Sequence, residues 1–284
     1  KTAKKLGLQS VVIYSAADKS SQHVLQADET ICVGPAPSSK SYLAKNAIIH
    51  TALSLSCDAI YPGYGFLSEN AEFVDLCEAN DIKFIGPAAD SIREMGDKST
   101  ARQLAVANNV PVVPGSDDAY DSLDEAVLAA KSINYPLLLK ARAGGGGRGM
   151  QIVKNESEFA TAFQRCSAEA RNAFGDGHIY IERYFEKIRH IEVQIFGDGR
   201  GKAIALGERD CSVQRRHQKL IEEAPASILS PRSRKQLHKT AAMLAAGVKY
   251  EGAGTIEFIY DPKTTEFFFI EMNTRIQVEH PVTE

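Results

Sequence analysis

Long apolar runs are missing from this sequence of 284 residues. The longest apolar stretch, residues 241–248, is far shorter than the roughly 20 apolar residues that a membrane-spanning helix needs. An excess of positive charge is missing too, because 33 Lys and Arg residues face 36 Asp and Glu residues, for a net charge of −3. Binding to nucleic-acid phosphates requires a basic surface. We therefore expect neither a membrane nor a nucleic acid as partner.

Paired cysteines are also missing. The five cysteines are odd in number, widely scattered and never in C-x-x-C spacing: Cys32, Cys57, Cys77, Cys166 and Cys211. This pattern argues against a disulfide framework and against a zinc site. No apolar segment follows the basic start at Lys1–Leu6, so no secretory signal is visible. The sequence favours a reducing compartment, either the cytoplasm or, in a eukaryote, the mitochondrial matrix.

The first ~110 residues alternate between helix and strand, which is typical of a parallel α/β sheet. The pattern predicts helices near 40–55, 69–80, 88–95 and 98–108, and strands near 57–61 and 82–86. The chain begins with what looks like the end of a helix, before a strand at 10–14. It stops at Glu284, just after another predicted strand. We expect a fragment that is truncated at both ends.

Beyond Pro111 the pattern changes. Capping-box spacings at Ser122-x-x-Glu125 and Asn155-x-x-Glu158 predict two helices, between strands near 136–140 and 178–184. From His190 apolar and polar residues alternate as in an antiparallel sheet. Ser230 as N-cap with Pro231 next predicts one further helix. The expected parts are 1–86, a helical linker 87–112, a small unit 113–184 and a second sheet unit 185–284.

The stretch 266–278 is predicted to be one strand with two different faces. Even positions from Phe268 to Val278 are apolar, whereas the odd positions from Glu271 to Glu279 are all polar. Glu271 and Asn273 supply oxygen ligands about 6–7 Å apart along such a strand. Glu257, in the preceding strand, supplies a third, and together they predict a site for magnesium and a nucleotide. A solvated strand face is the alternative interpretation.

Two loops carry further groups that suit anions. Lys140 ends a strand before the glycine-rich residues 144–149, whose bare backbone N–H groups suit a phosphate. The alternative is a flexible linker, and the loop is not a P-loop because no Gly-Lys-Ser/Thr closes it. The run Gln214–Lys219 is dense in basic and amide groups. It is interpreted either as an anion-binding segment or as a solvated loop.

The sequence resembles a known family, the biotin carboxylases of the ATP-grasp superfamily. The motifs that carry the resemblance are Pro62–Asn70, Gly144–Met150, Arg189–Gln194, Glu208–Lys219, Glu222–Pro225 and Glu271–Pro281. Tyr61 stands where the family usually has His, and Arg142 and Ala143 vary the approach to the glycine loop. The resemblance implies an α/β and α+β fold: a parallel α/β N-terminal domain, a small ATP-grasp lid at 113–184 that closes over ATP, and an antiparallel C-terminal domain.

The resemblance also implies an activity. ATP would phosphorylate bicarbonate to carboxyphosphate, which would deliver CO2 to the N1 nitrogen of biotin. The implied nucleotide-binding residues are Lys98, Lys140, Gly146, Gly147, Glu182, Arg183, Tyr184, Phe185, His190 and His217. The implied ligands of Mg2+ or Mn2+ are Glu257, Glu271 and Asn273. The implied bicarbonate pocket comprises Lys219, Arg275, Gln277 and Val278, lined by Gln214, with Glu279 as the base.

The partners follow from the same resemblance. No biotin-attachment Met-Lys-Met motif is present, so biotin is expected on a carrier domain elsewhere, beside a carboxyltransferase subunit or domain. The full-length protein is expected to be a homo-oligomer, and residues 1–284 alone are expected not to carboxylate biotin. Residues 34–37 and 41–43 look most like those of the α subunits of acyl-CoA carboxylases, of the acetyl-, propionyl- or methylcrotonyl-CoA type.

Three alternatives stay open. The chain is similar enough to the biotin carboxylase modules of pyruvate and urea carboxylases that these are close rivals. A non-catalytic nucleotide-binding module is a rival of a different class, although the site residues that the resemblance implies are present. Other ATP-grasp ligases, such as carbamoyl phosphate synthetase, lack the runs 214–219 and 271–281.

Overall fold

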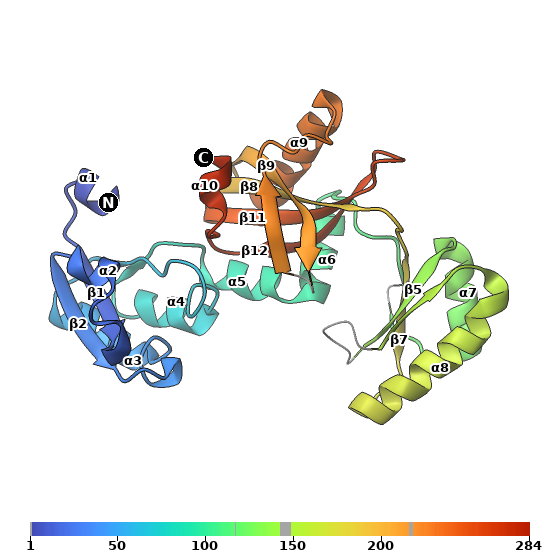
Figure 1. Ribbon diagram of the computed structural model, residues 1–284, viewed down its shortest axis with the longest axis horizontal. Helices are drawn as coiled ribbons and strands as arrows, with labels where there is room; N and C mark the ends of the chain where they lie inside the picture. The colour runs from blue at the N-terminus through green and yellow to red at the C-terminus, as the bar shows by residue number, and fades with distance from the viewer. Residues whose placement is uncertain (1, 117, 143–148, 216–217) are drawn as a thin grey trace. The chain divides into compact units, whose positions relative to one another are not determined.

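The structure is a computed structural model that describes residues 2–116, 118–142, 149–215 and 218–284 (Figure 1). The chain divides into two units. The first unit contains Lys1–Val110, Ile191–Phe258 and Glu271–Glu284, and the second contains Pro111–His190 and Ile259–Ile270. Each unit has a hydrophobic core of its own. The predicted division into four parts stays a prediction.

The N-terminal part of the first unit alternates helix and strand, as predicted. Strand β1 (Val11–Ser15) pairs in parallel with β2 (Glu29–Gly34), and β3 (Ala59–Ile60) pairs in parallel with β4 (Lys83–Phe84). These strands form two separate two-stranded sheets, not the single sheet that the alternation suggests, and β3 and β4 pair over only two residues each. The helices are α1 (Thr2–Lys5), α2 (Gln22–Leu25), α3 (Lys45–Ser54), α4 (Ala71–Glu78), α5 (Ala89–Gly96) and α6 (Lys98–Ala107), with short 3-10 turns at Ala16–Asp18 and Ser38–Lys40.

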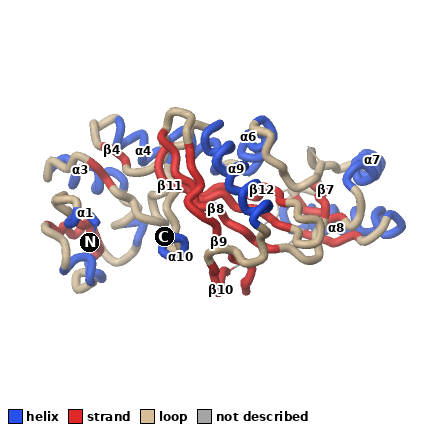
Figure 2. The backbone as a smooth tube through the Cα atoms, turned by 90° about the horizontal axis from the view of Figure 1, so that it is seen from above, coloured by secondary structure: helices blue, strands red, loops and turns tan. Residues whose placement is uncertain are grey.

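A five-stranded sheet, most of which belongs to the first unit, has the strand order β10-β9-β8-β11-β12 (Figure 2). Its strands are β8 (Arg189–Asp198), β9 (Ala203–Arg215), β10 (Gln218–Glu223), β11 (Glu251–Tyr260) and β12 (Phe267–Asn273). Helix α9 (Pro231–Gly247) packs against β9. Its predicted N-cap is confirmed, because the Ser230 hydroxyl accepts a 3.0 Å hydrogen bond from the Ser233 N–H. The fully buried side chains of Leu237 and Leu244 each stabilise this packing by about 2 kcal/mol.

Strand alternation gives the two faces of this sheet different chemistry. In β8, Ile191, Val193 and Ile195 lie on the face that α9 covers, and Glu192 and Gln194 lie on the other. Glu192 is paired with Arg209 of β9, which places the Arg209 side chain on the same face. All of these side chains are buried. The sheet therefore carries a buried polar layer opposite α9.

Strand β12 is shorter than predicted. It ends at Asn273, and residues 274–279 continue as a loop and turn into the short helix α10 (His280–Thr283). The prediction of one strand face reaching Glu279 is therefore wrong. A loop can also alternate between polar and apolar residues when its side chains point in different directions. Here the Thr274 backbone N–H and the Arg275 side chain, at the start of the loop, bond to Glu69 on another segment.

The second unit is a three-stranded antiparallel sheet under two helices. Its elements are α7 (Leu123–Ile133), β5 (Leu137–Ala141), β6 (Met150–Val153), α8 (Glu156–Phe174) and β7 (Ile179–Arg183). Leu137, Leu139 and Ile181 face the helices, so Lys140 and Glu182 lie on the opposite face. Asn155 is the N-cap of α8, because its side chain accepts from the Glu158 N–H, whereas the Ser122 side chain makes no capping hydrogen bond.

None of the helices within the described ranges has the length and the apolar character to cross a bilayer.

Candidate functional site

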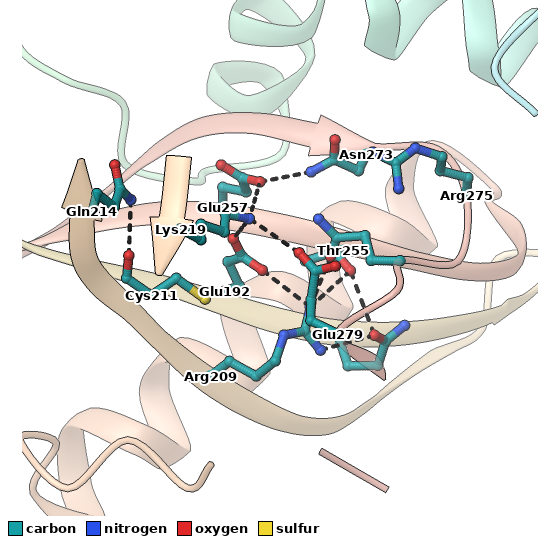
Figure 3. A network of polar contacts seen from close by, with 12 residues as sticks. Glu192, Arg209, Cys211, Gln214, Lys219, Thr255, Glu257, Asn273, Arg275 and Glu279 are labelled. Atoms are coloured by element: carbon teal, nitrogen blue, oxygen red, sulfur yellow. Dashed lines mark hydrogen bonds and ion pairs between the residues drawn. The ribbon is translucent and has the colours of Figure 1, made fainter. Parts of the chain in front are cut away.

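A lysine surrounded by carboxylates occupies the polar face of the five-stranded sheet (Figure 3). The Lys219 Nζ atom bonds to the Glu192 carboxylate and lies 3.4 Å from Glu257 Oε1 and 3.3 Å from Glu279 Oε1. The Glu192 side chain is fully buried, and the side chains of Glu257 and Glu279 are 7% and 8% exposed. Burial alone would lower the pKa of Lys219, but Glu257 and Glu192 raise it above its ordinary value. The ammonium group therefore stays charged.

A buried arginine lies behind this cluster. The Arg209 side chain is completely buried, and its charge is balanced by Glu192 at 3.1 Å. Glu192 thus lies between Lys219 and Arg209, with one carboxylate oxygen toward each (Figure 3). The Arg209 guanidinium donates to five side chains: Glu192 (3.1 Å), Gln277 (2.7 Å), Thr255 (3.3 Å), Gln194 (3.1 Å) and Thr283 (2.8 Å). Arg209 therefore links strands β8, β9 and β11 to the residues that follow β12.

The three predicted metal ligands lie on adjacent strands of this sheet. The Asn273 side-chain amide donates to Glu257 Oε1 at 2.7 Å. Glu271, two residues before Asn273 on β12, has a carboxylate oxygen 4.0 Å from Lys98 Nζ. Two carboxylates and an amide oxygen are the donor types that hard divalent cations take. Glu257, Glu271 and Asn273 therefore suit a divalent cation. The Lys98 ammonium group beside Glu271 shows that a positive charge fits at this carboxylate.

The loop after β12 is anchored at its start by Glu69. One Glu69 carboxylate oxygen accepts from the Thr274 N–H at 3.0 Å, and the other accepts from Arg275 Nε at 2.9 Å. The Arg275 Nη1 group also donates to the Ile276 carbonyl at 3.2 Å. Arg275 therefore contacts Glu69, whereas Glu279 contacts Lys219.

In the second unit the predicted nucleotide residues form two pairs. Lys140 and Glu182 make a direct ion pair on the open face of the small sheet. The Arg183 guanidinium lies 4.9 Å from the centre of the Phe185 ring, in cation–π geometry. The Phe185 ring in turn lies 5.2 Å from that of Phe268. The structure thus provides one ion pair and one cation–π pair from the predicted set.

The remaining predicted residues have varied surroundings. The Tyr184 N–H donates to the Pro136 carbonyl at 2.8 Å, and the Gln214 side chain donates to the Cys211 carbonyl at the same distance. His190 is half-buried on β8, and Val278 is 60% exposed. Gly146, Gly147 and His217 lie outside the described residues.

Comparison with known proteins identifies the family. Residues 1–92 match the family described as biotin carboxylase, N-terminal domain. Residues 97–284 match the family described as carbamoyl-phosphate synthase L chain, ATP binding domain. The whole chain is 51% identical to biotin carboxylase 2, chloroplastic, of Populus trichocarpa. The chain belongs to the biotin carboxylase family.

Other biotin carboxylases and carboxylase subunits are similarly close. The chain is 52% identical to the mitochondrial methylcrotonoyl-CoA carboxylase subunit alpha of Mus musculus, of which it covers 40%. Its fold matches the biotin carboxylase of Campylobacter jejuni with a TM-score of 0.84 at 52% identity, covering all of this chain and 63% of that one. A bicarbonate-bound biotin carboxylase domain of a thermophilic 2-oxoglutarate carboxylase gives a TM-score of 0.92 at 45% identity, with 99% and 61% covered. The chain spans 54% of the Populus relative.

The sequence patterns assigned no role to Arg209, Glu192 or Glu69, although each lies in one of the motifs that carry the resemblance to the family. The alternation of His190, Glu192 and Gln194 on β8 was a usable signal for Glu192. Arg209 is harder to find, because it stands between Glu208 and Asp210 in a charged triplet that is typical of an exposed turn. Glu69 and Arg275 are separated by 206 residues, so only the fold brings them together.

Proposed function

We propose that this biotin carboxylase uses ATP to carboxylate biotin with bicarbonate, through carboxyphosphate. The observation that carries the proposal is the Lys219 ammonium group, held on a buried sheet face within 3.3 Å of the Glu279 carboxylate. A fixed positive charge attracts a small anion, and the adjacent carboxylate is available as a base. Family membership supports ATP and biotin as the other two substrates.

In the proposed anion pocket, three side chains receive bicarbonate. Lys219 supplies a point charge, and Gln277 supplies an amide that Arg209 orients from behind. Arg275 supplies a guanidinium, of which Nε and Nη1 are engaged by Glu69 and by a backbone carbonyl. A guanidinium has five N–H donors, so further donors remain for an anion. Val278 contributes at the exposed rim.

Glu279 acts as the base in this proposal. Its carboxylate removes the proton from bicarbonate while a bicarbonate oxygen attacks the γ-phosphorus of ATP, and ADP leaves with the electrons of the broken P–O bond. The product, carboxyphosphate, breaks down to CO2 and phosphate. The biotin N1 nitrogen then gives its proton to the released phosphate and attacks CO2 to give carboxybiotin. The Lys219–Glu279 contact supports this step, because bicarbonate bound at Lys219 would lie close to the base.

Glu257, Glu271 and Asn273 would hold Mg2+ or Mn2+, whose charge would neutralise the phosphate oxygens of ATP when bound. Lys98 and Lys140 are proposed to meet the phosphates with Gly146 and Gly147, and residues 182–185 to meet the adenine. His190 and His217 are also proposed to contact the nucleotide, whereas Gln214 is proposed to line the bicarbonate pocket. The ADP-bound and magnesium-bound states named for solved 2-oxoglutarate carboxylase domains support this choice. The expected lid at 113–184 stays a prediction.

The acceptor of the carboxyl group is proposed to be an acyl-CoA, reached through a biotin carrier domain and a carboxyltransferase. The α subunits of methylcrotonoyl-CoA and propionyl-CoA carboxylases are 52% and 49% identical to the chain, which supports this class. Pyruvate carboxylase is the close alternative, since a biotin carboxylase subunit of that enzyme is 48% identical. We propose a homo-oligomer, as one related domain is described as a dimer. The proposed compartment is the cytoplasm or the mitochondrial matrix.

The test is Glu279→Gln in the full-length protein, which keeps the shape of the side chain and removes the base. We expect bicarbonate-dependent ATP hydrolysis to fall about a hundredfold, the size typical of general-base loss. Glu78→Gln, an exposed carboxylate on α4, is the matched control and should retain the wild-type rate. Near wild-type turnover in the Glu279→Gln protein would show that the assigned role is wrong.

A further inference from the structure

The loop 274–279 carries three of the proposed bicarbonate residues and its base, yet it lies outside the sheet. Strand β12 ends at Asn273, so strand pairing does not hold the loop. Its start is fixed by Glu69 through Thr274 and Arg275. A second anchor is needed at its end, because a loop free to move would spread Gln277 and Glu279 over many positions.

Arg209 has the geometry of that second anchor. Its Nη2 group donates to Gln277 Oε1 at 2.7 Å, and its Nη1 group donates to Thr283 Oγ1 at 2.8 Å in α10. These two contacts fall on either side of Glu279 in the sequence. Arg209 also holds Glu192, whose other oxygen binds Lys219. One buried side chain therefore reaches both the cation and the loop of the proposed anion pocket.

We infer that Arg209 is a positioning residue for bicarbonate, acting through Gln277, Glu192 and Thr283 without touching the substrate itself. This inference rests on the proposed function. The planar guanidinium directs several N–H groups in fixed directions, so it can serve Gln277 and Glu192 from one nitrogen and Thr283 from the other. The single ammonium of a lysine cannot reproduce that set.

The test compares Arg209→Lys with Arg234→Lys in the full-length protein. Arg234 is the matched control, because it makes a 2.7 Å ion pair with Glu208 on the opposite face of β9 and touches none of the pocket residues. For Arg209→Lys we expect the KM for bicarbonate to rise about tenfold while the KM for ATP changes less than about twofold. For Arg234→Lys we expect a lower melting temperature with both KM values unchanged.

A second variant keeps the inference testable if Arg209→Lys does not fold. Thr283→Val removes one acceptor of Arg209 and preserves the methyl group that packs near Gly207. We expect a rise of about threefold in the KM for bicarbonate alone. Equal changes in the two KM values, or no change in either variant, would overturn the inference. If the wild type shows no bicarbonate-dependent ATP hydrolysis, the proposed function itself fails.

Discussion

The Lys219 ammonium and the Glu279 carboxylate are separated by 60 residues in the chain and by 3.3 Å in space. Lys219 lies on the edge strand β10, and Glu279 follows β12 at the other edge of the same sheet. Both side chains reach across the buried polar layer between them. The proposed anion site and the proposed base therefore lie side by side, although their residues come from opposite edges of the sheet.

Replacing Lys219 with Met should destabilise the protein, because three carboxylates would lose their shared cation. We expect the free energy of unfolding in urea to fall by about 3 kcal/mol. The pKa of Lys219 is raised in the folded state, so its contribution is complete below the unfolded pKa of about 10.4 and is lost only as pH rises through the folded value. The difference from wild type should therefore be constant from about pH 6 to about pH 9. A difference that shrinks within that range would contradict the account.

Replacing Glu69 with Gln should loosen the start of the loop that carries Arg275. The amide keeps one acceptor oxygen but loses the charge that pairs with the guanidinium. We expect a rise of about tenfold in the KM for bicarbonate, measured by ATP hydrolysis. Glu72→Gln is the control, because Glu72 pairs with Lys45 and is largely exposed. Equal effects of the two substitutions would contradict the anchoring role.

Glu208 should make stability depend on pH in the acid range. Burial raises its pKa, but hydrogen bonds from His238 and Arg234 outweigh burial and hold the pKa below its ordinary value. The stabilisation is therefore present above the unfolded pKa of about 4.3 and is lost as pH falls through the folded value. We expect Glu208→Gln to cost about 2 kcal/mol at pH 7 and progressively less below about pH 4 in urea titrations. A cost that is independent of pH would refute this.

The cysteines should differ in reactivity, although all five are free. Cys32 is exposed and Cys57 is half-buried, whereas Cys77, Cys166 and Cys211 are buried. Burial raises the pKa of Cys77 to about 11, which suppresses its thiolate. We expect a thiol reagent at pH 8 to label Cys32 first and the three buried thiols only after unfolding, as read by peptide mass spectrometry. Rapid labelling of Cys77 in the folded protein would contradict the packing.

The helices of this protein could be predicted well from local chemistry. Ser230 caps α9 and Asn155 caps α8 because both signals depend on a few neighbouring residues.

The site could be predicted only in part, because its contacts join distant segments. The strand pattern at 266–278 marked Glu271 and Asn273 correctly as strand residues but continued five residues too far. At the start of the loop Thr274 and Arg275 bond to Glu69, a contact that no local pattern reveals. Arg209 was missed for the same reason, since its neutralisation by Glu192 depends on the register between β8 and β9.

The most direct test of the account is the release of phosphate from ATP by the full-length wild-type protein, measured with and without bicarbonate and with and without free biotin. We expect slow hydrolysis that requires bicarbonate and is accelerated by biotin, with carboxybiotin as a product. ATP hydrolysis that is indifferent to bicarbonate, or no hydrolysis under any of these conditions, would contradict it.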